Sequence, residues 1–173
     1  MKIYLTSGTM DFMKSLRKKY SAESMIVMYG ASNTVLLHET EGKSLFQTPL
    51  RYEVIGTSGS LKEDGYFAFN HIPVTDEGRP IFEHRFMMRD NSTDSQPGFI
   101  AIRLLRPLDS NTYIVLTEWE NASYYHKWEN SASFQQVNKE SIAGADKTLH
   151  IFSSAPHITK YHTKKSNENE DKA

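Results

Sequence analysis

Residues 66–89 read YFAFNHIPVTDEGRPIFEHRFMMR, an apolar and aromatic run followed by an amphipathic one. The first part, 66–74, has the composition of a β-strand. The second part, 77–89, predicts a helix, because Asp76 precedes it and negative charge suits a helix N-terminus. Pro80 is compatible with this helix only if it lies in the first turn. A strand that leads into a helix in this way is the start of an α+β unit.

The rest of the second half completes that unit. The polar stretch 91–97 predicts a loop. Strands, helical segments and a last strand are then predicted, in order, at 99–106, 112–120, 121–128 with Asn121 as N-cap, 131–141 and 148–161, the last with a possible interruption at Pro156. The resulting order β-α-β-β-α-β over residues 66–162 is the ferredoxin-like arrangement.

The first half has the pattern of an incomplete copy of the same unit. A strand at 2–7 precedes a helix that Thr9 can cap, and two further strands follow. A strand or short helix is expected at 52–55. Since one ferredoxin-like unit leaves a sheet face open, the first half is expected to cover the second.

The predicted fold class is therefore α+β, a ferredoxin-like barrel of the dimeric type made within one chain. The expected organisation is a partial N-terminal lobe at 1–62, a ferredoxin-like domain at 63–162, and a disordered tail at 163–173. This closure predicts a monomer. The alternative is a homodimer in which the N-terminal segment is an addition.

Composition excludes several classes of function. The chain has 173 residues, 38% of them hydrophobic, with 20 basic and 21 acidic residues and a net charge of −1. No single-sign field is expected to attract nucleic acid or an anionic membrane. The chain has no cysteine, which excludes disulfides, thiolate metal sites and a cysteine nucleophile. The N-terminus reads as a strand and not as a signal peptide, so a cytoplasmic location is expected.

Asn70 is the most unusual residue of the 66–74 strand, because it is an amide among apolar neighbours. Strand alternation places it on one face with Ala68 and Ile72 and places His71 on the other. A buried amide without partners costs roughly 1–3 kcal/mol. Asn70 therefore either bonds to nearby backbone or faces a polar ligand.

Aromatic and basic residues share one face of the predicted helix 77–89. They are Phe82, Arg85, Phe86 and Arg89, at spacings of three and four. This face is either part of a binding site or the side of an ordinary amphipathic helix with solvated arginines. Trp128, on the next helix, is by itself most simply a core residue.

Four motifs in the second half occur in a particular order and spacing. They are Asn70 in its strand, Gln96-Pro97-Gly98-Phe99, Trp119-Glu120 and Lys127-Trp128-Glu129-Asn130-Ser131. This set resembles the Isd-type haem-degrading monooxygenases of the antibiotic-biosynthesis-monooxygenase superfamily, and most of all their longer, HmoB-like branch. The segment AIRLLRPLDS at 101–110 is also similar to that branch. The resemblance covers most of the chain and is strongest over 65–138.

The resemblance implies roles for particular residues. Asn70 would be the asparagine that donates a hydrogen bond toward the oxygen being activated, and Trp128 the tryptophan that distorts the haem. Phe86 would line the haem pocket, and Arg85 would meet a propionate. Asn138 stands where the family places its axial histidine, and an amide is a poor iron ligand compared with imidazole. Three explanations for the missing histidine are open: another ligand, weak haem binding, or a substitution that was introduced on purpose. For the first of these, His84 is the best-placed residue.

The implied activity is oxidative opening of the haem ring with O2 and external electrons, which releases iron and a bilin-type product. Haem would be both cofactor and substrate, with a reductase or an ascorbate-like reductant as the other partner. Loss of the histidine favours an alternative, a non-catalytic haem-binding or regulatory protein like the staphylococcal signal-transduction protein TRAP of the same branch. A cofactor-free monooxygenase acting on a quinol-like substrate is a third reading, which the Asn70 and Trp128 pair disfavours.

Overall fold

A computed structural model describes residues 1–132, 134 and 151–163. The elements, in chain order, are β1 (Lys2–Gly8), α1 (Met10–Lys19), β2 (Met25–Gly30), β3 (Thr34–Thr40), β4 (Leu50–Ser58), β5 (Tyr66–Pro73), α2 (Arg79–Met87), the 3-10 turn η1 (Ser92–Ser95), β6 (Phe99–Pro107), β7 (Thr112–Trp119), α3 (Ala122–Glu129) and β8 (His157–His162). Among these residues, no helix is long and apolar enough to cross a membrane.

The strands form a closed antiparallel barrel in the order β1-β3-β2-β8-β5-β7-β6-β4. The N-terminal strands contribute the run β4-β1-β3-β2, and the C-terminal strands contribute β8-β5-β7-β6. Numbered within each half, both runs have the order 4-1-3-2. The predicted ferredoxin-like barrel within one chain is therefore confirmed, and β4 supplies the fourth strand of the first half.

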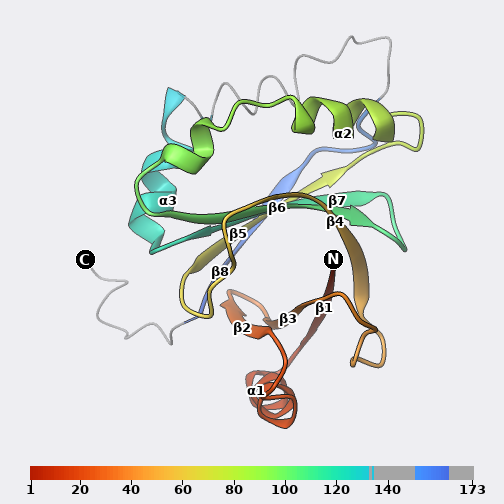
Figure 1. Cartoon of the computed structure of the whole chain (residues 1–173), viewed down its shortest axis with the longest axis vertical. Coiled ribbons are helices and arrows are strands. Elements are labelled where there is room, and N and C mark those ends of the chain that lie inside the picture. Colours follow the sequence, from red (N-terminus) through yellow and green to blue (C-terminus); the bar gives the residue numbers. More distant parts are fainter. Residues whose placement is uncertain (133, 135–150, 164–173) are drawn as a thin grey trace.

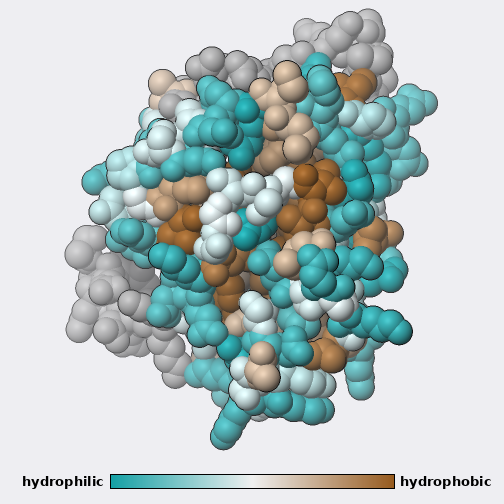
Figure 2. Space-filling view, viewed as in Figure 1, coloured by the Kyte–Doolittle hydropathy of each residue, from teal (hydrophilic) through white to brown (hydrophobic). Residues whose placement is uncertain are grey.

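Helices cover the barrel on two sides (Figure 1). Helix α1 lies on the N-terminal side, while α2 and α3 lie on the opposite side, over the C-terminal strands. The barrel interior is filled by apolar side chains from both halves, among them Ile3, Leu37, Phe67 and Leu116. A separate cluster that includes Met13 packs between α1 and its strands. Apolar groups on the face viewed in Figure 2 lie in separate patches among hydrophilic side chains.

Several element boundaries differ from the sequence-based expectation. Helix α2 begins at Arg79 and not at 77, because the backbone amide of Gly78 donates to Thr75 and closes a turn first. Pro80 then lies in the first turn, as its ring requires. The segment around 52–55 is a strand, β4. The last strand begins at His157, directly after Pro156, and the expected helical segment 131–141 lies mostly outside the described residues.

Glu118 is a carboxyl group buried completely in the barrel. Its oxygens accept hydrogen bonds from the backbone amide of Lys62 at 2.6 and 3.2 Å. Burial raises the pKa of Glu118 from its ordinary value of 4.5 to about 8, although the Lys62 amide and the charges of Lys62 and Arg103 act against this shift. Between these two values the folded protein keeps a proton that the unfolded chain releases.

We therefore expect the free energy of unfolding to fall as the pH rises from 5 toward 8, because the unfolded state binds fewer protons there. Glutamine has the shape of a neutral glutamate but does not ionise. In the Glu118→Gln variant, the loss of unfolding free energy between pH 5 and pH 8 should therefore be smaller than in the wild type by an amount on the order of 3 kcal/mol. Urea unfolding at both pH values measures it, with Glu120→Gln, at an exposed position, as the matched control. Parallel stability curves for the wild type and Glu118→Gln would contradict the expectation.

Candidate functional site

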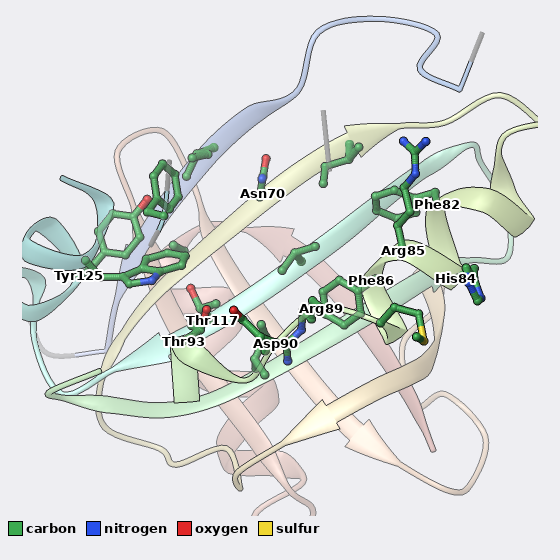
Figure 3. Close-up of a pocket in the computed structure, with 18 residues that line it drawn as sticks. Asn70, Phe82, His84, Arg85, Phe86, Arg89, Asp90, Thr93, Thr117 and Tyr125 are labelled. Carbon is green, nitrogen blue, oxygen red and sulfur yellow. The ribbon is translucent and has the colours of Figure 1, made fainter. Parts of the chain in front are cut away.

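A cavity of about 450 Å³ lies between the C-terminal strands and the helices that cover them. Residues of β5, β6, β7 and β8 form one wall, and α2, η1 and α3 form the others. Figure 3 shows Tyr125 at one end, Phe82 and Arg85 toward the other, and Asn70 between them. The volume is within the range of small-molecule and cofactor sites.

Strand β5 presents alternate side chains to two different spaces. Ala68, Asn70 and Ile72 line the cavity, whereas Phe69 and His71 line a second space of about 550 Å³ in the barrel mouth. Burial and, second, the neighbouring His157 lower the pKa of His71 to about 4. The two rings are stacked with centroids 4.5 Å apart. His71 therefore belongs to the barrel and not to the cavity.

The Asn70 side chain carries a buried oxygen, Oδ1, with no hydrogen-bond partner among the described residues. The assignment of oxygen and nitrogen in an amide follows from the surrounding network. Asn70 is also one of the residues that line the cavity, and Figure 3 shows its side chain there. An amide in this position is a neutral donor or acceptor for a bound molecule.

Trp128 closes one end of the cavity and is 9% exposed. Its ring centroid lies 5.1 Å from that of Trp119, at a tilt of 31°. It lies 4.7 Å from that of Phe134, which it meets edge-on. Asn121 caps the helix by accepting from the Tyr124 amide at 3.2 Å, which fixes where Trp128 lies. Trp128 is thus both a packed residue and a wall of the cavity.

Helix α2 brings its predicted face to the cavity. Phe82 is 2% exposed and packs edge-on against Tyr113, while Phe86 and Arg85 are partly buried. His84 also borders the cavity but is exposed, and in Figure 3 its ring lies at the outer edge. Asn138 lies outside the described residues.

Sequence reasoning missed three lining residues that carry hydroxyl groups, namely Thr93, Thr117 and Tyr125. Tyr125 stands three residues before Trp128, so helical spacing could have placed both on one face. Burial, and second the neighbouring Glu129 carboxylate, raise the pKa of Tyr125. Thr117 follows from alternation with Val115 along β7.

The cavity can hold a molecule with a broad apolar body and a few polar groups. Aromatic walls suit a flat ring system. Asn70 supplies one polar contact on the strand side, and arginines 85 and 89 supply positive charge on the helix side. Among residues 1–132, 134 and 151–163, no cluster of three or more histidine, aspartate or glutamate side chains could hold a bare metal ion.

Residues 65–140 match the family model described as antibiotic biosynthesis monooxygenase. A heme-degrading monooxygenase of Listeria monocytogenes is 26% identical over 136 residues, which are 79% of this chain and 81% of that protein. The signal transduction protein TRAP of Staphylococcus aureus is 26% identical over 161 residues, which are 92% and 93% of the two chains. The curated relatives thus divide between two names.

Solved structures share the fold. The structure of a major regulator of staphylococcal pathogenesis has a TM-score of 0.86 at 23% identity, covering 95% of this chain and 100% of that one. A heme-degrading enzyme from Listeria monocytogenes has a TM-score of 0.73 at 22% identity, with the same coverage. At these identities the likeness shows the α+β barrel and not the activity.

Proposed function

We propose that the chain is a haem-degrading monooxygenase that opens the haem ring with O2 and external electrons. The observation that carries this proposal is the Asn70 amide, which borders an apolar cavity closed by Trp128 at one end and bordered by Arg85 of α2 and by Arg89 just after it. These residues fit a large, flat, apolar ring with anionic edges. The match of 65–140 to a monooxygenase family and the relative named a heme-degrading monooxygenase support the same reading.

Each wall would have one task in this reaction. Haem, when bound, would supply the redox chemistry, with electrons from a reductase or an ascorbate-like reductant. Trp128 would press on the ring face, since distortion of the macrocycle is a means of tuning its reactivity. Asn70 would donate a hydrogen bond at the reacting face. Phe86 would keep water out, and Arg85 would meet a carboxylate of the ring.

A second candidate function is a non-catalytic haem-binding or regulatory role. Asn138 favours it, because the resemblance places an axial histidine there. The relatives named TRAP favour it too. His84 would be the candidate substitute ligand, because it borders the cavity, although its exposed position leaves it at the edge.

We also propose that 63–162 is the haem-binding domain, that 1–62 completes the barrel, and that the protein is a monomer. The support is the closed barrel, in which β4 pairs with β6 and β2 pairs with β8. Both open edges of the second half are thereby occupied within the chain.

A titration of the purified protein with hemin, followed by ascorbate in air, tests the proposed function. We expect a shift of the Soret band that saturates at one haem per chain, and then its decay with release of iron. A stable complex that does not decay would favour the non-catalytic alternative. Absence of any shift would show that the protein does not bind haem and would contradict the proposed function.

Asn138→His is expected to strengthen hemin binding and to speed the decay, because imidazole is a better iron ligand than an amide. About tenfold tighter binding is expected, which is the lower end of the effects that changes around the ligands of a metal have on its affinity. The matched control is Asn130→His, at the exposed end of α3. Equal spectra and affinities for Asn138→His and the wild type would show that position 138 is not proximal to the iron.

A further inference from the structure

Arg89 borders the cavity just after the C-terminal end of α2. Its guanidinium lies 4.8 Å over the ring of Phe86, and Nη1 donates to the backbone oxygen of Asp90 at 3.2 Å. The side chain is 15% exposed. Figure 3 shows Arg89 beside Phe86 and Asp90. The guanidinium is thus held against an aromatic face, with further donors that have no hydrogen bond to another described residue.

Asp94 is the acidic partner of Arg89, but the two are not in hydrogen-bond contact. Oδ1 of Asp94 lies 3.8 Å from Nη1 of Arg89. A charge-assisted hydrogen bond between such groups is about 2.8 Å long. Oδ1 is also buried without a hydrogen-bond partner among the described residues. Asp94 therefore reduces the positive potential at Arg89 without occupying its donors.

Ser58 is the hydrogen-bond partner of the other carboxylate oxygen of Asp94. The Ser58 hydroxyl donates to Oδ2 of Asp94 at 2.6 Å. Ser58 is the last residue of β4 and pairs with Ile102 of β6, and its own carbonyl accepts from Arg103 at 3.1 Å. Ser58 is consequently fixed by the sheet, and its hydroxyl binds a carboxylate whose residue is not among those that line the cavity.

We propose that Ser58 and Asp94 are specificity-determining residues that set the affinity of the cavity for an anionic group. Ser58 keeps the carboxylate of Asp94 back, so the guanidinium of Arg89 can donate to a carboxylate or sulfonate of the ligand. This inference rests on the proposed function in one respect, that ligands bind in this cavity. It makes a strand of the N-terminal half part of the binding site, outside the region 65–140 that matches the family model.

The test uses two fluorescent probes of similar shape and different charge, so it does not depend on haem. The anionic probe is 8-anilino-1-naphthalenesulfonate and the uncharged one is N-phenyl-1-naphthylamine. The ratio of the two affinities measures how much the negative charge of the probe contributes to binding. We expect Ser58→Ala to lower the preference for the anion about fivefold, because Asp94 can then close on Arg89. Asp94→Asn should raise it about tenfold, and Arg89→Gln should lower it.

The opposite signs of the first two variants separate this role from a structural one, which would change both probes alike. Ser58→Ala made in the Asp94→Asn background should have no further effect on the ratio. Ser58→Thr, which keeps the hydroxyl, should restore the wild-type ratio. Ser95→Ala, which removes an exposed hydroxyl of the same turn that donates to Ser92, is the matched control and should leave the ratio unchanged.

Changes of the same sign in Ser58→Ala and Asp94→Asn, or an unchanged ratio in both, would overturn the proposal. Unfolding curves of each variant show whether the fold is kept.

The same comparison of affinities, made with hemin and hemin dimethyl ester, then distinguishes this inference from the proposed haem function. If Ser58→Ala and Asp94→Asn change the ratio of probe affinities in opposite directions but hemin does not bind, only the proposed haem function fails. If hemin is degraded but the ratios do not move, only this inference fails.

Discussion

Asn70→Ala is expected to slow the oxidative decay of bound haem about 100-fold, the usual cost of losing one oriented donor at a reacting centre. The hemin affinity should change much less, because the aromatic walls and the arginines remain. The stability of the protein should be kept or slightly raised, since the substitution removes a buried amide atom that has no described partner. Single-turnover decay after addition of ascorbate, together with a hemin titration, measures both effects.

The neighbouring residue provides the control for Asn70→Ala. His71 lies on the same strand but lines the barrel mouth instead of the cavity. His71→Ala should therefore leave the decay rate close to that of the wild type. A wild-type decay rate in Asn70→Ala, or an equal loss in both variants, would show that the amide has no role in turnover.

The sequence predicted the parts of the site that depend on local periodicity. Strand alternation separates Asn70 from His71, and helical spacing brings Phe82 and Phe86 to one side, as the structure has them. Barrel closure followed from counting sheet faces that need cover. The alternation and the helical spacing depend on neighbours two to four residues apart, which a single sequence contains.

The features that sequence reasoning missed depend on distant contacts or on competing turns. Ser58 and Asp94 are 36 residues apart and meet only because β4 pairs with β6. No periodic pattern connects a serine at a strand end with an aspartate in a short turn. The start of α2 was misplaced for another reason, since the turn closed by Thr75 competes with the first helical turn.

Gly98→Ala is expected to lower the free energy of unfolding by roughly 3 kcal/mol, from left-handed backbone strain and from overpacking together. Gly98 has a φ of +78°, and an added Cβ would lie 2.2 Å from Cγ of Tyr124. Its carbonyl accepts from the Glu120 amide at 2.8 Å, so the backbone has little freedom to move away. Urea unfolding of the variant and the wild type measures the loss.

The contact of Gly98 with Tyr124 also makes this glycine a spacer between β6 and α3, the helix that carries Trp128. If α3 moves outward to admit the Cβ, the wall of the cavity moves with it, and hemin and the naphthalene probes should bind more weakly. Gly98→Ala combined with Tyr124→Ala should recover the part of the loss due to the clash, but not the part due to the backbone. Gly42→Ala is the control, because its Cβ would meet only Thr40 Oγ1 at 3.5 Å, and its effect should stay within about 0.5 kcal/mol. If Gly98→Ala were as stable as Gly42→Ala, β6 and α3 could separate without loss of stability. The contact between Gly98 and Tyr124 would then not hold Trp128 in place.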